Sequence, residues 1–136
     1  MPIAFPNSEL QFVLQEVLSN AENVHLFQNN FDVLPGTFTL ADFVEATFSG
    51  YAVQALAGSN WNFSGSTTAV AEYNSGLTFQ SDASDQDQQI YGYYITRDGG
   101  TELLYAETFP NGPYHIDMVG DSVTVIPRVT ATNVVE

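Results

Sequence analysis

Hydrophobic residues recur at helical spacing in one segment near the start of the chain, NSELQFVLQEVLSNAEN. Asn7 or Ser8 can cap the amino end, and Glu9 falls in the first turn, where the helix dipole favours a negative charge. The spacing therefore predicts one amphipathic helix over roughly residues 8–19, with Phe12 off the apolar face and exposed. The apolar face consists of Leu10, Val13, Leu14, Val17 and Leu18.

From Asn23 onward the pattern changes to short apolar and β-branched runs separated by turn residues. Strand signals at about ten-residue intervals, joined by tight turns, predict a mainly β fold, an antiparallel β-sandwich or jelly roll. Arg97-Asp98-Gly99-Gly100 is the best hairpin turn, because two consecutive glycines tolerate positive φ. The expected strands are Val24–Gln28, Tyr51–Leu56, Trp61–Phe63, Thr67–Tyr73, Leu77–Gln80, Gln89–Thr96, Glu102–Phe109, Tyr114–Met118 and Ser122–Val129.

Two of these strands show only partial alternation of apolar and polar residues, Ile90–Thr96 and Leu103–Phe109. A strand of this kind is covered on both faces, so we expect a second layer or another subunit over them. We find no internal repeat and no linker, and we predict a single β-sandwich domain over residues 23–136.

Residues 1–22 are predicted to form an N-terminal arm that carries the helix. Two arrangements fit this segment: the helix docks on a partner or joins copies of the chain, or it packs over its own sheet. In the first arrangement the partner-binding residues are Leu10, Phe12, Val13, Leu14, Val17 and Leu18.

The charge balance narrows the range of partners. Sixteen acidic residues accompany two basic ones, Arg97 and Arg128, and the formal net charge is −14. Binding to a nucleic acid backbone needs several lysines or arginines, and anionic membranes favour the same residues, so we expect neither partner. The acidity fits a solvated surface, a surface that avoids nucleic acid, or one adapted to salt.

Signals for disulfides, secretion and membrane insertion are lacking in the sequence. The chain has no cysteine, and its opening MPIAFPNSELQF lacks the basic and apolar regions of a secretory peptide. No apolar run approaches the roughly 18 residues of a membrane span. We therefore expect a protein that is made in a cytoplasm and folds through packing and backbone pairing alone.

Metal ligation has two weak candidates. His115 and Asp117 lie two residues apart on one predicted strand face, which suits either a zinc site with further ligands or the wet side of a strand. Asp82, Asp85 and Asp87, with Glu72, offer oxygen ligands for calcium. Their spacing lacks the glycine and the distal glutamate of an EF-hand loop, so a solvated acidic loop is the favoured interpretation. We predict no metal and no cofactor.

Catalytic motifs are equally sparse. The sequence contains no G-x-S-x-G serine and no cysteine nucleophile, and Gly99-Gly100 lacks the strand–glycine–helix context of a phosphate loop. Two histidines, His25 and His115, give little support to a metal-dependent jelly-roll enzyme. Trp61 is the only tryptophan and suits a core position. We expect a protein that is not an enzyme.

A compact junction, LADFVEATFSGYA, occupies Leu40–Ala52. The Thr39 hydroxyl can cap a short helical turn near residues 40–46, and Asp42 can accept the Thr39 backbone N–H. Gly50 breaks the turn and Tyr51 begins a strand, so the junction is predicted to close an end of the two-layer fold. The residues expected to point inward are Leu40, Phe43 and Val44, and the acids expected to face water are Asp42 and Glu45.

The junction is one of several motifs in a fixed order: HLFQNN, LADFVEATFSGYA, IYGYYIT, LLYAETFP and GDSVTVIPRV. Over about residues 24–129 this order resembles the pattern of small β-sandwich structural proteins found in the virions of tailed bacteriophages. The resemblance implies a virion component, such as a capsid decoration (cement) protein or a piece of a fibre or tail tip.

From this resemblance we expect a decoration protein that binds the outer surface of a phage capsid and contacts the major capsid protein, as a homotrimer. A receptor- or glycan-binding tip domain of a tail or head fibre is the alternative. That alternative draws on the aromatic residues Trp61, Tyr91, Tyr93, Tyr94 and Tyr105.

Overall fold

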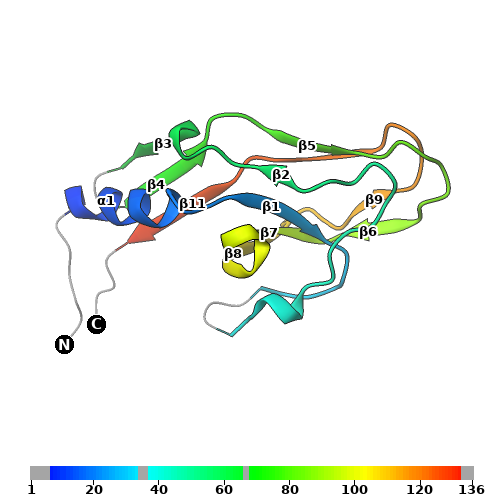
Figure 1. Ribbon diagram of the computed structural model, residues 1–136, viewed down its shortest axis with the longest axis horizontal. Coiled ribbons are helices and arrows are strands. Elements are labelled where there is room, and N and C mark those ends of the chain that lie inside the picture. Colours follow the sequence, from blue (N-terminus) through cyan, green and yellow to red (C-terminus); the bar gives the residue numbers. More distant parts are fainter. Residues whose placement is uncertain (1–6, 34–36, 66–67, 133–136) are drawn as a thin grey trace. The chain divides into compact units, whose positions relative to one another are not determined.

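The computed structural model describes residues 7–33, 37–65 and 68–132. Every strand pairing within these ranges is antiparallel, which confirms the predicted mainly β class with one N-terminal helix and a helical turn inside residues 40–46 (Figure 1). The elements are α1 (Asn7–Leu18), β1 (Asn23–Phe27), η1 (Leu40–Asp42), β2 (Gln54–Ala55), η2 (Gly58–Asn60), β3 (Trp61–Ser64), β4 (Thr68–Tyr73), β5 (Leu77–Gln80), β6 (Gln88–Ile90), β7 (Gly92–Arg97), η3 (Asp98–Gly100), β8 (Glu102–Thr108), β9 (Tyr114–Ile116), β10 (Ser122–Val125) and β11 (Arg128–Thr132).

The chain divides into two compact units. Unit 1 is built from the described parts of Met1–Ala21, Ala57–Gly76 and Ile126–Glu136, and unit 2 from Glu22–Leu56 and Leu77–Val125. This grouping joins the helix to strands from the middle and the end of the chain, whereas the sequence prediction separated residues 1–22 from residues 23–136. Whether either segment folds alone stays a prediction.

Unit 1 is a three-stranded sheet in the order β11-β4-β3 with α1 packed along it (Figure 1). The helix buries Leu10, Leu14 and Leu18, which are spaced by four residues and therefore lie on one helical face. Of the two arrangements open for this helix, the structure has the one in which the helix packs over its own sheet. Trp61 is buried in the same unit, with its ring centroid 5.3 Å from that of Tyr73.

Unit 2 is organised around a four-stranded sheet in the order β2-β1-β7-β8. β7 is buried along both faces, as the partial alternation of its sequence predicted, and β8 is half-buried. The Arg97–Gly100 turn joins these two strands, with positive φ at both of its glycines. Two short ribbons, β5 with β10 and β6 with β9, complete the unit.

Three predicted strands are strongly shortened or interrupted in the structure, beyond differences of one or two residues at the ends of others. The strand expected over Tyr51–Leu56 is reduced to β2, because the Tyr51 side chain turns into the unit to make hydrogen bonds. The strand expected over Gln89–Thr96 is divided between β6 and β7, which pair with different partners. The strand expected over Ser122–Val129 is interrupted before β11 at Pro127, which has no N–H to donate to a ladder.

Candidate functional site

The predicted partner-binding residues of α1 differ in burial, and Val13 is partly buried. Leu10, Leu14 and Leu18 are buried against the chain's own sheet, and in this structure no partner can reach them. Phe12 is 53% exposed, as the sequence predicted, and Val17 is 45% exposed, which corrects its assignment to the inward face. A role for these residues in partner binding stays a prediction.

The residues considered as metal ligands do not come together in the described part of the structure. Nε2 of His115 lies 2.9 Å from Oδ1 of Asp87, and Asp117 uses its carboxylate to accept the Asp87 backbone N–H. Asp82 accepts a hydrogen bond from Ser49, and Glu72 belongs to unit 1, where it faces Arg128. Among the described residues, no three or more His, Asp or Glu side chains are placed to hold a metal ion.

The junction LADFVEATFSGYA is tied to β1 by Glu45. One oxygen of its carboxylate lies 2.7 Å from Nδ1 of His25 and accepts the Tyr51 phenol at 2.6 Å. Because a carboxylate only accepts, Nδ1 donates, and Nε2 of a neutral ring then accepts from the Thr96 hydroxyl at 2.8 Å. Glu45 was expected to face water, and its side chain is 38% exposed, but it is also the centre of a hydrogen-bonded network that the sequence did not predict.

Other parts of the junction act in the same structural way. Asp42 accepts the Thr39 backbone N–H at 2.8 Å, as predicted. Asn29 donates to the Asp42 carbonyl and accepts the Val44 N–H, so it fastens the junction to the end of β1. Phe43 is buried and Leu40 is partly buried, as expected, whereas Val44 is 53% exposed and does not point inward.

Aromatic rings cover this network. The His25 ring stacks on Tyr94 with centroids 4.6 Å apart, and Tyr94 stacks in turn on Phe43 at 4.8 Å. Burial, and then the hydrogen bond to Glu45, raises the pKa of the Tyr51 phenol well above its usual range. Burial followed by the charge of Glu45 does the same to the pKa of Tyr94. Both phenols are therefore neutral near pH 7.

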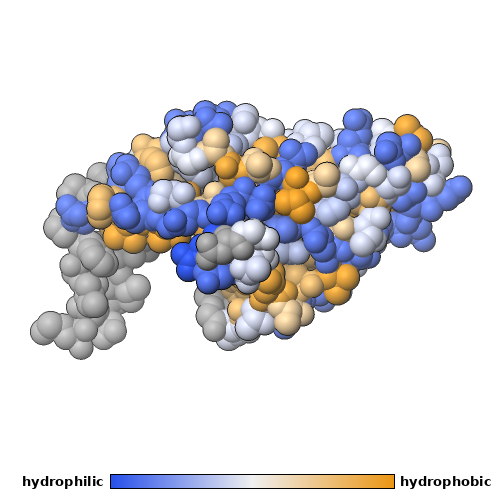
Figure 2. All heavy atoms as spheres, in the orientation of Figure 1, coloured by the Kyte–Doolittle hydropathy of each residue, from blue (hydrophilic) through white to orange (hydrophobic). Residues whose placement is uncertain are grey.

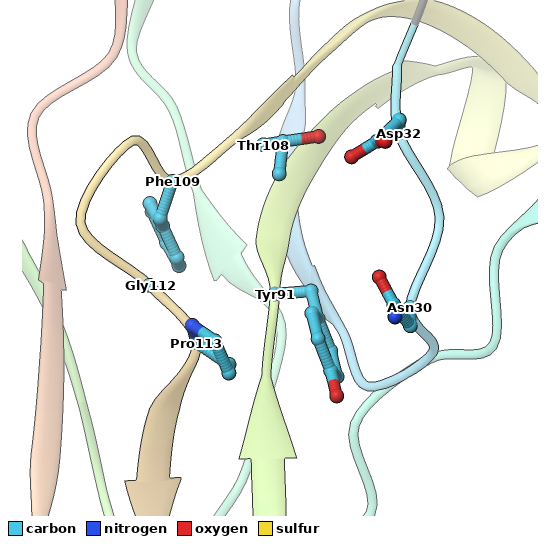
Figure 3. A pocket seen from close by; sticks show the side chains of 7 residues that line it. All are labelled: Asn30, Asp32, Tyr91, Thr108, Phe109, Gly112 and Pro113. Carbon is cyan, nitrogen blue, oxygen red and sulfur yellow. The ribbon is translucent and has the colours of Figure 1, made fainter.

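A pocket of about 400 Å³ lies where the sheet of unit 2 ends. Because β1, β7 and β8 run antiparallel, the last residues of β1 and β8 and the first of β7 meet at the same edge. Tyr91, between β6 and β7, stands in the middle of the pocket, with Asn30 and Asp32 to one side of it and Phe109 and Pro113 to the other (Figure 3). Thr108 and Gly112 complete the lining.

The backbone around the pocket is held by hydrogen bonds. The Tyr91 N–H donates to the Phe27 carbonyl at 3.0 Å, and the Tyr91 carbonyl accepts the Phe109 N–H at 2.8 Å. Thr108 accepts the Val33 N–H through its hydroxyl, which holds the segment after β1 against the end of β8. The pocket walls are therefore fixed to the sheet on both sides.

Sequence reasoning identified one residue of this pocket. Tyr91 was among the aromatic residues considered for ligand binding, and the structure places it at the pocket, whereas Trp61, Tyr93 and Tyr94 are buried in cores and Tyr105 is half-buried on β8. Asn30 and Asp32 lie outside every strand expected from the sequence. The sequence did carry a signal, since both polar residues and the turn before Pro113 directly follow predicted strands, but strand order decides that these loops meet.

A second exposed feature is the turn between β9 and β10. Met118 and Val119 are 54% and 63% exposed at its tip. Asp121 accepts the backbone N–H of Met118 at 2.8 Å and that of Asp117 at 3.0 Å, which fixes the turn beneath them. Figure 2 shows hydrophobic residues in small groups among hydrophilic ones on the face drawn, and an apolar group at this turn.

Both arginine side chains lie beside glutamate side chains. Arg97 pairs with Glu102 across β7 and β8 at 2.6 Å, and Arg128 lies 3.7 Å from Glu72 across β4 and β11. These are the two basic residues of the chain, and exposed pairs of this kind stabilise by at most about 1 kcal/mol. The described part of the chain also contains no helix long and apolar enough to cross a membrane.

No family model, curated protein or solved structure matches this chain.

Proposed function

We propose that this chain is a structural virion protein, a decoration protein that binds the outer surface of a phage capsid through contacts with the major capsid protein. The ordered motifs between residues 24 and 129 motivate the virion assignment. The geometry supports a role in binding rather than in chemistry, because His25 and Glu45, which resemble a catalytic pair, are used to hold the junction to β1.

The observation that supports this proposal most directly is the apolar turn between β9 and β10. Met118 and Val119 project from a turn that Asp121 holds in place, so docking them costs little ordering of the chain. Full burial of a methionine or valine side chain is worth roughly 1.5–3 kcal/mol, and Met118 and Val119 each have somewhat more than half of that burial still to gain. At a net charge of −14, contact with another acidic surface must rest on such apolar groups rather than on charge attraction.

The same charge bears on self-association. Copies of the chain repel one another at low ionic strength, and a Debye length of about 8 Å at physiological salt limits that repulsion to the contact region. We propose a homotrimer. Size-exclusion chromatography with light scattering at two salt concentrations tests it, and a monomer at both would contradict the trimer while leaving capsid binding to be tested separately.

The decisive experiment is cryo-electron microscopy of the virion that carries this chain. Density for the chain on the capsid shell is the expected result, and density confined to the tail would contradict the proposal. Co-sedimentation of the purified protein with undecorated capsids tests the surface. Replacing Met118 and Val119 together by aspartate should weaken binding at least about tenfold, which is about 1.4 kcal/mol.

The matched control for that variant is Val44→Asp. Val44 is 53% exposed and also lies in unit 2, but it belongs to the junction rather than to the β9–β10 turn. It should bind capsids as the unaltered protein does. Equal loss in both variants would show that added negative charge, and not the apolar turn, controls binding.

A receptor- or glycan-binding tip domain is the second candidate, and the pocket around Tyr91 favours it. The two candidates differ in location, since a fibre or tail-tip domain places the chain away from the shell. The microscopy experiment therefore separates them.

A further inference from the structure

Three polar groups at the pocket have no hydrogen-bond partner within the described protein: the amide of Asn30, the carboxylate of Asp32 and the phenol of Tyr91. Asn29 and Asp42, by contrast, use their side chains to hold the junction. The pocket thus gathers donors and acceptors that the fold does not use for its own stability, beside the rings of Tyr91, Phe109 and Pro113 (Figure 3).

We propose that this pocket binds a neutral saccharide. A sugar ring has apolar C–H faces and a rim of hydroxyl groups, so it needs both an aromatic surface and hydrogen-bonding groups at the edge. The electron-rich face of an aromatic ring attracts C–H groups, and Tyr91 supplies such a face. Asp32 can accept from two hydroxyls, and Asn30 can both accept and donate.

The charge of the site selects against acidic ligands. The pocket lining contains one carboxylate and no cation, and both arginines of the chain are paired with glutamates elsewhere. A phosphate, a sialic acid or a uronic acid would approach Asp32 without a compensating positive group, in a chain of net charge −14. Neutral hexoses and N-acetylhexosamines carry no such penalty.

The size and rigidity of the pocket fit a small ligand. Its volume of about 400 Å³ is within the roughly 300–1,000 Å³ range of small-molecule sites. Hydrogen bonds from Tyr91 to β1 and from Val33 to Thr108 hold its walls in the free protein. A ligand therefore meets a formed site and does not have to order the chain.

The saccharide proposal deepens the second candidate function, the glycan-binding domain, and is independent of the decoration role, since capsid binding does not involve the pocket. The test uses the full chain, labelled, on an array of neutral and acidic glycans. Isothermal titration with the best neutral sugar follows, with inorganic phosphate, a uronic acid and an arginine-containing peptide as competing probes.

Two variants address the two parts of the site. Asp32→Ala removes an exposed carboxylate, and Tyr91→Leu removes the ring while keeping an apolar side chain against the core. Each should weaken binding of the neutral sugar at least about tenfold. Glu16→Ala and Phe12→Leu are matched controls on α1, an exposed carboxylate and an exposed ring outside the pocket, and they should leave binding unchanged.

Circular dichroism of each variant separates loss of the site from loss of the fold. If Tyr91→Leu fails to fold, Asp32→Ala alone decides, because its side chain makes no contact that the fold requires. Three results would overturn the proposal: no neutral glycan bound at millimolar concentration, unchanged affinity in Asp32→Ala, or a preference for the acidic sugar, phosphate or peptide over the neutral sugars.

Discussion

The phenol of Tyr51 makes hydrogen bonds with two groups that have no partner within the sheet. It accepts the Leu26 backbone N–H at 3.1 Å and donates to Glu45 at 2.6 Å. Leu26 directs its carbonyl to Ala46, so this side of β1 faces the junction rather than another strand, and no strand supplies an acceptor for the Leu26 N–H. A tyrosine is needed here because a phenol both accepts and donates.

Tyr51→Phe should therefore destabilise the protein by about 1–3 kcal/mol, because it leaves a buried N–H without a partner. The control is Tyr114→Phe, whose phenol is exposed and makes no hydrogen bond in the described structure. Urea denaturation of the purified variants measures both changes. Equal midpoints for the two variants would show that water replaces the phenol beside Leu26.

Gly50 and Gly120 share the same φ angle, so comparing them separates the cost of backbone strain from the cost of a steric clash. Gly50 and Gly120 both have φ +92°, which penalises any side chain, but a Cβ on Gly50 would lie 2.6 Å from the Gln80 carbonyl oxygen, whereas Gly120 has open space. Gly50→Ala should lower the free energy of unfolding by more than Gly120→Ala does, and the difference measures the steric clash. Thermal unfolding followed by circular dichroism tests this ranking. Equal losses would mean that the Gln80 backbone moves aside.

At the scale of elements, the turn between β9 and β10 depends on the ionised form of Asp121. Hydrogen bonds from the backbone N–H of Met118, and then of Asp117, lower the pKa of its carboxyl below the usual range. A lowered pKa means that the contribution to stability is complete above the usual carboxyl range, near pH 4, and is lost as pH falls through the folded value.

We therefore expect the Met118 amide to show slow exchange at neutral pH and to lose protection only in acid. Asp121→Asn should speed exchange of that amide at neutral pH and remove its acid transition. Asp85→Asn is the control, since asparagine tolerates the positive φ of 61° at that position and Asp85 makes no hydrogen bond in the described structure. Amide exchange by nuclear magnetic resonance measures both, and unchanged protection in Asp121→Asn would contradict the turn's dependence on charge.

Elements that are determined by residues close together in the sequence were predicted well, and features that depend on distant residues were not. The helix, the β7–β8 turn and β5 follow from residue spacing and from the glycines, so the sequence located them closely. The role of Glu45 could not be predicted, because its partners include His25, 20 residues away, and only strand pairing brings them together. The pocket was out of reach for the same reason: Asn30, Tyr91 and Thr108 belong to three separate segments.

The division of the sequence at residue 22 illustrates the same limit. The helical spacing of the hydrophobic residues shows that α1 has an apolar face, but it does not show which surface covers that face. The structure covers it with β4, a strand that begins fifty residues after the helix ends. A contact between residues so far apart in sequence cannot be recognised from the residue pattern of either segment.

At the scale of the whole molecule, tyrosine ionisation connects the fold to the large negative charge. Burial raises the pKa of Tyr51, Tyr94 and Tyr105 above the usual phenol range, and the nearby charge of Glu45 adds to this for Tyr51 and Tyr94. A raised pKa favours the neutral form in the folded state. Its stabilising effect is complete below about pH 10 and is lost as pH rises further.

Alkaline titration followed by phenolate absorbance should therefore show a stage that coincides with unfolding. Tyr51, Tyr94 and Tyr105 ionise only when the fold is lost, because burial disfavours their phenolates and each new phenolate adds to a charge that is already −14. Near-ultraviolet circular dichroism should disappear in that stage. In denaturant the seven tyrosines should titrate together, and a single stage in the native protein with its dichroism intact would show that Tyr51, Tyr94 and Tyr105 are accessible to hydroxide.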